Sequence, residues 1–142
     1  NGGEIFNPSI LVPLDWVPDM AVIAYGTNDW GATDRELARE HATEFLDRFC
    51  QIWPGLPTYV ISPIWRADYL TRRGDDFRHE EIREILLRSA EKNPQIKVIN
   101  GYNLFPRIEA LMFDERLHPN ELGFCIYAKR LITELDKLDH KQ

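Results

Sequence analysis

Two short polar strings hold the residue types that could do chemistry. Gly26-Thr27-Asn28-Asp29 follows an apolar run, and His118-Pro119-Asn120 precedes the last amphipathic stretch of the chain. An imidazole can exchange protons near neutral pH, and a carboxamide can donate and accept hydrogen bonds. Each string also has a purely local interpretation, as a strand-to-helix turn and as a helix start. Chemistry therefore depends on whether the fold brings the two strings together.

Strand-like and helix-like patterns alternate along the chain and would position both strings. An apolar run typical of a strand covered on both faces spans Met20 to Tyr25, and residues 58–61 and 96–99 are predicted to form two further strands. Amphipathic stretches predict helices over residues 34–53, 77–92 and 121–138, the first capped by Asp34. This alternation predicts a single α/β domain over residues 1–142 with a parallel sheet. Asn28 would lie at the carboxyl end of that sheet, where ligands bind, and His118 on the loop returning from the third strand.

Each predicted helix has an apolar face that should point into the core. The first helix carries on one face Leu37, Ala38, His41, Ala42, Phe45, Leu46 and Phe49. The second carries Ile82, Ile85, Leu86 and Ala90. The last carries Ile126, Tyr127, Leu131, Ile132 and Leu135.

Composition excludes several classes of protein. The net charge of −6 argues against nucleic-acid binding, which needs a basic surface. No apolar run approaches the roughly 20 residues that span a bilayer, so we expect a soluble protein with no integral membrane segment. Cys50 and Cys125 fit no metal spacing and no disulfide framework, and we expect two buried free thiols. The compartment is open, with the cytoplasm favoured over secretion.

Both strings resemble conserved blocks of the SGNH (GDSL) hydrolase superfamily. The string from Tyr25 to Asp29 is similar to the third block, Gly-x-Asn-Asp, and Trp30 resembles its usual surroundings. The string from Glu115 to Asn120, followed by Gly123, is similar to the fifth block, where a carboxylate stands three residues before a His-Pro pair. The blocks occur in the family's order, and the resemblance covers nearly the whole chain.

The resemblance implies a flavodoxin-like, three-layer α/β/α fold and ester hydrolysis by a Ser-His-Asp mechanism. It implies that His118 is the general base, which takes the serine proton and returns it to the leaving alcohol. Asn28 would donate its side-chain amide to the oxyanion, and Gly26 would let the backbone turn. The implied substrate is a small ester, such as a lipid, an acetylated sugar or a thioester. No cofactor and no metal are implied.

The carboxylate that orients His118 is open between two neighbours. The family spacing selects Glu115, although the family normally has Asp at that position. Asp114 lies one residue earlier and has the shorter side chain. A backbone carbonyl is a further alternative, and of the two carboxylates we expect Glu115 first.

The nucleophile is missing from the resemblance. The chain contains no Gly-Asp-Ser string, and its three serines are Ser9, Ser62 and Ser89, none of them in a suitable elbow. We therefore expect the C-terminal part of a hydrolase domain, truncated to about three strands and inactive or nearly so by itself. Gly2 resembles the oxyanion glycine of the second block, or else belongs to a flexible end.

Two expectations concern surfaces. With upstream strands absent, the run from Met20 to Tyr25 would become an apolar sheet edge that invites self-association or retention of an upstream segment of the parent chain. Trp30 and Trp65 follow predicted strand ends and could line a substrate pocket, or else belong to the core or to a lid.

The sequence thus favours a serine esterase or acylhydrolase. The alternative is a non-catalytic binding module or pseudoenzyme on the same fold, and the main support for that alternative is Glu115 in place of Asp. An unrelated flavodoxin-like regulatory domain is a distant third reading, because the acidic cluster and late Lys of a receiver domain are not in place.

Overall fold

The computed structural model describes residues 7–27, 35–67, 79–114 and 117–139. Its strands are β1 (Ala21–Ala24), β2 (Thr58–Ile61) and β3 (Ile96–Ile99). Its α-helices are α1 (Arg35–Ile52), α2 (His79–Ala90), α3 (Gly101–Leu104) and α4 (Glu121–Asp139). Two 3₁₀ turns, η1 (Pro8–Ile10) and η3 (Glu109–Leu111), complete the described elements.

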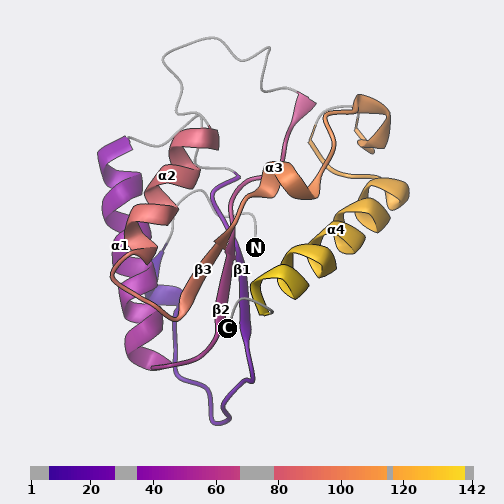
Figure 1. Ribbon diagram of the computed structural model, residues 1–142. Helices are drawn as coiled ribbons and strands as arrows, with labels where there is room; N and C mark the ends of the chain where they lie inside the picture. The colour runs from indigo at the N-terminus through magenta and orange to yellow at the C-terminus, as the bar shows by residue number, and fades with distance from the viewer. Residues whose placement is uncertain (1–6, 28–34, 68–78, 115–116, 140–142) are drawn as a thin grey trace. The chain divides into compact units, whose positions relative to one another are not determined.

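The three strands form one parallel sheet in the order β1-β2-β3 (Figure 1). Ala21 pairs with Thr58, and Thr58 in turn pairs with Ile96. Parallel neighbours need long crossover connections, and α1 and α2 lie in those connections. The predicted α/β class and the three-stranded parallel sheet are therefore confirmed.

Contacts divide the chain into two units, which are described separately below. Unit 1 comprises Asn1–Pro63 and Asp75–Ile99, and unit 2 comprises Ile64–Gly74 and Asn100–Gln142. Unit 1 contains the sheet with α1 and α2, and unit 2 contains α3, η3 and α4.

In unit 1, α1 and α2 pack against each other on one side of the sheet (Figure 1). Two side-chain hydrogen bonds join the helices and the turn that follows α2. The hydroxyls of Thr43 and Ser89 are 2.9 Å apart, and Asn93 Nδ2 donates to Asp47 Oδ1 at 2.8 Å. The central strand β2 is buried at all four positions. The prediction that the run from Met20 to Tyr25 is covered on both faces is wrong, because the residues of β1 alternate between half-buried and exposed.

In unit 2, the core is a cluster of Trp65, Phe105, Leu111 and Met112. Half-buried Ile126 and Tyr127 of α4 pack against this cluster, so the last helix is attached to it by one apolar face. Asn100 caps α3 by accepting a hydrogen bond from the backbone N–H of Tyr102.

Two predicted core positions are wrong. Leu37 on α1 is 38% exposed and Ile132 on α4 is 60% exposed. Each lies next to a more buried neighbour, Ala38 or Leu131. Successive helical residues are rotated by about 100°, so each apolar face is narrower than the sequence pattern suggested. The predicted face of α2 is confirmed, because Ile82, Ile85, Leu86 and Ala90 are all buried.

Both cysteines are free thiols, as predicted, but the prediction that both are buried is wrong. Cys50 is half-buried on α1 and Cys125 is exposed on α4. Burial, with a smaller contribution from Asp47, raises the pKa of Cys50 to about 11. In the part of the chain that is described, no helix is long and apolar enough to span a membrane.

Candidate active site

Gly26 makes the turn by which the chain leaves β1. Its φ of +96° is a backbone conformation that residues with a side chain rarely adopt. The space beside it is also filled, since a Cβ atom there would lie 2.6 Å from Cγ2 of Ile82 on α2. Glycine is therefore required both by the backbone and by packing, as its proposed role in a tight turn demands.

His118 is held by the carboxylate of Asp114. Its ring atom Nδ1 lies 2.8 Å from Asp114 Oδ2, and its backbone N–H donates to Asp114 Oδ1 at 2.9 Å. The backbone N–H of Leu117 donates to the same Oδ1 at 2.6 Å. One carboxylate therefore fixes both the ring and the main chain at His118.

This pairing sets the tautomer of the imidazole. An ionised carboxylate can only accept hydrogen bonds, so the proton of the neutral ring lies on Nδ1. Nε2 then carries the lone pair and can accept a proton from another group. The His118 side chain is 70% exposed, so the ring is accessible. The arrangement is that of a general base with its orienting acid.

A short hairpin presents this pair. The backbone N–H of Phe113 donates to the His118 carbonyl, and Met112 and Pro119 form an antiparallel bridge. Leu111 accepts a hydrogen bond from the backbone N–H of Asn120 at 2.8 Å. Residues 111–113 are thus hydrogen-bonded to residues 118–120, on the two sides of the loop that carries Asp114 and His118.

Several predicted site residues lie outside the described residues, namely Asn28, Trp30, Glu115 and Gly2. The structure therefore does not test a role for Glu115, but it does give His118 a carboxylate partner in Asp114. Sequence reasoning places Asp114 second because the family spacing selects Glu115. The signal that favours Asp114 is chemical, since Asp readily accepts hydrogen bonds from backbone N–H groups a few residues ahead.

Trp65 lies in the core of unit 2. It is only 7% exposed and packs with Phe105, Leu111 and Met112. This placement favours the core interpretation that the sequence left open, and a contribution to a substrate pocket stays a prediction.

The three serines occupy structural positions. The Ser89 side chain is buried and shares its hydroxyl hydrogen bond with Thr43. Ser62 is 2% exposed, and its backbone N–H donates to the Ile99 carbonyl. Ser9 lies in η1, at the cap formed by Asn7. Burial argues against Ser62 and Ser89 as nucleophiles.

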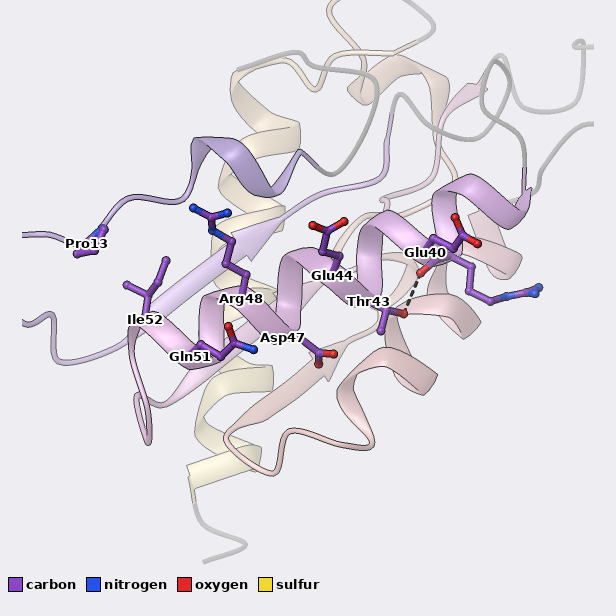
Figure 2. A pocket seen from close by; sticks show the side chains of 9 residues that line it. Pro13, Glu40, Thr43, Glu44, Asp47, Arg48, Gln51 and Ile52 are labelled. Carbon is purple, nitrogen blue, oxygen red and sulfur yellow. Dashed lines mark hydrogen bonds between the residues drawn. The ribbon is translucent and has the colours of Figure 1, made fainter.

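Unit 1 also contains an open cavity of about 860 Å³ along the outer face of α1 (Figure 2). Pro13 and Ile52 border one end, and charged or polar side chains of α1 line the rest. No His, Cys or Ser is among the described residues that line it, and its Thr43, Asp47 and Arg48 side chains are already engaged. Asp47 accepts from Asn93, and Arg48 donates to the Leu11 carbonyl at 3.4 Å. The cavity therefore lacks the groups of a nucleophilic site.

Comparison with solved structures shows the fold. A salicylyl-acyltransferase from a tetracycline biosynthetic pathway matches with a TM-score of 0.74 and 18% identity, over 88% of this chain and 39% of that one. A lipase/acylhydrolase from Enterococcus faecalis matches with a TM-score of 0.62 and 20% identity, over 83% of this chain and 61% of that one. A Lactobacillus plantarum protein matches with a TM-score of 0.69 and 19% identity, over 84% of this chain and 67% of that one.

This chain thus spans from about two fifths to two thirds of the length of these similar structures. No curated protein sequence matches it. The sequence profile of the GDSL-like lipase/acylhydrolase family matches residues 3–124, a stretch that includes both Gly26 and the Asp114–His118 pair. The chain belongs to the GDSL-like lipase/acylhydrolase family.

Proposed function

We propose that this chain supplies the general base and one oxyanion donor of a serine hydrolase that cleaves carboxylic esters. His118 takes the proton of a serine hydroxyl as the oxygen attacks the ester carbonyl, and returns it to the leaving alcohol. Asn28 donates its amide to the oxyanion that develops. The serine comes from a Gly-Asp-Ser segment that these 142 residues do not contain.

One observation carries this proposal. The 2.8 Å contact between His118 Nδ1 and Asp114 Oδ2 leaves Nε2 as the ring nitrogen able to accept a proton. We therefore assign Asp114 as the orienting carboxylate, ahead of Glu115. Membership of the lipase/acylhydrolase family supports an ester as the substrate class.

The test is active-site labelling with a fluorophosphonate, followed by peptide mapping. It compares this chain, the longer protein that contains it and that longer protein with His118→Ala. We expect only the longer protein to be labelled, on a serine outside these residues, and the label to collapse in the variant. This is because the members of a nucleophile–base pair act as a unit.

Two other results would overturn the proposal in different ways. Labelling of the isolated chain would place the nucleophile at Ser9, Ser62 or Ser89. No labelling of the longer protein, alongside a labelled control esterase, would favour the non-catalytic binding module. Once labelling is established, unlabelled longer protein can be given an ester substrate, from which it releases the alcohol to form an acyl-enzyme, in the presence of water alone or of an added second alcohol. Product analysis then separates a hydrolase from an acyltransferase, the activity named for one structurally similar protein.

A further inference from the structure

Asn120 is the N-cap of α4. Its side-chain Oδ1 accepts a hydrogen bond from the backbone N–H of Gly123 at 2.9 Å. Its carbonyl accepts the first helical hydrogen bond, from the N–H of Phe124 at 2.8 Å. This is the ordinary geometry of a capping residue, and Asp or Ser would serve a cap about equally well.

The same side chain makes a second hydrogen bond that a cap does not need. Asn120 Nδ2 donates to the carbonyl of Ala110 at 2.8 Å, while the Asn120 backbone N–H donates to the carbonyl of Leu111, also at 2.8 Å. Ala110 and Leu111 belong to η3, so Asn120 joins the end of η3 to the start of α4.

Packing at Gly123 makes this junction tight. A Cβ atom on Gly123 would lie 2.5 Å from the Leu111 carbonyl oxygen and 3.1 Å from Pro119 Cβ. The backbone of α4 therefore approaches η3 as closely as glycine allows, which holds the Ala110 carbonyl within reach of the Asn120 side chain.

Between the two joined points lies the hairpin that carries Asp114 and His118. We propose that Asn120 is a positioning residue for His118, an inference that rests on the proposed role of His118 as a base. By fixing both ends of the hairpin, Asn120 holds Asp114 and the imidazole in register across it. The bond to Ala110 carries this function, whereas the bond to Gly123 caps the helix.

The chemistry of the side chain separates the two functions. Asp at position 120 still accepts from Gly123, but it cannot donate to Ala110 and would set a carboxylate against that carbonyl. Ser still caps the helix but is too short to span both partners. Both substitutions should therefore preserve α4 while removing the side-chain hydrogen bond to Ala110 of η3.

The experiment uses Asn120→Asp and Asn120→Ser, with Asn7→Asp as the matched control. Asn7 caps η1 by accepting from Ser9 N at 3.0 Å, so this control makes the same substitution and adds the same charge at another cap. Each variant is made in this chain and in the longer protein that contains it. Two readouts are taken: the ¹⁵N chemical shifts of the His118 ring at a pH where it is neutral, and the rate of fluorophosphonate labelling.

We expect thermal midpoints within about 2 °C of the wild type for both Asn120 variants, because the cap is retained. The wild-type ring should show the Nδ1–H tautomer, and both variants should move toward a mixture of tautomers. Labelling of the longer protein should slow by about 10- to 100-fold, as for a misplaced catalytic group. In steady-state assays kcat should fall while KM is unchanged. Asn7→Asp should change neither readout.

A wild-type tautomer and labelling rate in folded Asn120→Asp and Asn120→Ser would reduce Asn120 to a helix cap and overturn the inference. If Asn120→Asp fails to fold, the uncharged Asn120→Ser decides. The ring shifts need no activity, so they judge Asn120 even where the longer protein is not labelled at all. In that case the proposed function fails separately.

Discussion

The side chain of Asp114 binds His118 twice, through the ring atom Nδ1 at 2.8 Å and through the backbone N–H at 2.9 Å. Asp114 stands four positions before His118, whereas the family pattern places the acid three positions before the His. A carboxylate that holds both the ring and its own main chain leaves the imidazole little freedom to rotate. This arrangement explains how a chain with Glu at the usual position can still hold its His ring in one orientation.

Asp114→Asn should therefore be the most damaging conservative change beside His118. Its amide would offer a donor to Nδ1 and so favour the wrong tautomer, a change that lowers kcat by about 10⁴-fold in the Ser-His-Asp triad of a serine protease. Glu115→Gln should cost much less, and Glu121→Gln, on the first turn of α4, is a charge-matched control. The measurement is the labelling or hydrolysis rate of the longer protein. A larger loss in Glu115→Gln than in Asp114→Asn would restore the choice made from the family spacing.

Gly26→Ala should destabilise unit 1 by about 2–5 kcal/mol. About 1–2 kcal/mol comes from forcing a side chain into a left-handed conformation, and about 1–3 kcal/mol from overpacking against Ile82. Gly55→Ala is the matched control, since Gly55 also has a positive φ, +77°, but nothing within 4 Å of its added Cβ. It should cost only the conformational share, about 1–2 kcal/mol. Urea unfolding of the chain measures both, and equal losses at the two glycines would show that Ile82 has room to move.

The exposed edge of β1 should make this chain self-associate. Among the described residues β1 pairs only with β2, and Val22 on β1 is 47% exposed. An apolar edge strand of this kind is a template for another strand. Light scattering should show dimers or larger species, and Val22→Lys should shift the chain toward monomer. Val12→Lys, at a 60% exposed position before β1, adds the same charge away from the strand. A wild-type monomer at every concentration would refute this prediction.

Cys50 should make stability fall at alkaline pH. Burial, followed by the charge of Asp47, raises the pKa of its thiol from 9.0 to about 11. The native state thus holds this proton more tightly than the unfolded chain does. The contribution is fully present below pH 9 and is lost as pH rises through about 11.

The measurement is the free energy of unfolding of the wild type and of Cys50→Ala, below pH 9 and near pH 11. The difference between the two proteins should shrink as pH rises, which removes the contributions of other titrating groups. Cys125→Ala, at the exposed thiol, is the control and should keep the wild-type slope. Parallel pH dependences of wild type and Cys50→Ala would contradict the shift.

Much of the fold could be predicted because strong local signals agreed with it. The predicted strands at residues 58–61 and 96–99 have the same bounds as β2 and β3, since each is rich in residues that favour strands and is followed by residues that stop a strand. The four-residue α3 and the 3₁₀ turn η3 were not predicted, because elements this short have no hydrophobic period to detect. Leu37 and Ile132 are wrongly predicted to face the core because the hydrophobic period does not reveal how wide the buried face of a helix is.

The candidate site likewise has one part that could be predicted from the sequence and another that could not. His118 and Gly26 could be selected as candidates from residue type and order along the chain, and Gly26 has the positive φ of a residue at a turn. The choice of Asp114 depends on how the backbone curls between residues 114 and 118, and the second bond of Asn120 depends on η3 lying beside α4. Both interactions depend on distances that the folded backbone sets, so spacing along the sequence could not predict them.

The sheet register has a consequence for synthesis on the ribosome. Ala21 pairs with Thr58, 37 positions later, and Thr58 pairs with Ile96, 38 positions later. No described strand can therefore find its partner among its near neighbours, and each pairing must close a long loop against chain entropy. During synthesis β1 leaves the exit tunnel before β2. Until β2 has also emerged, β1 has no strand to pair with among the described residues. During that interval its apolar residues depend on whatever else is within reach, including chaperones or an earlier part of the same polypeptide.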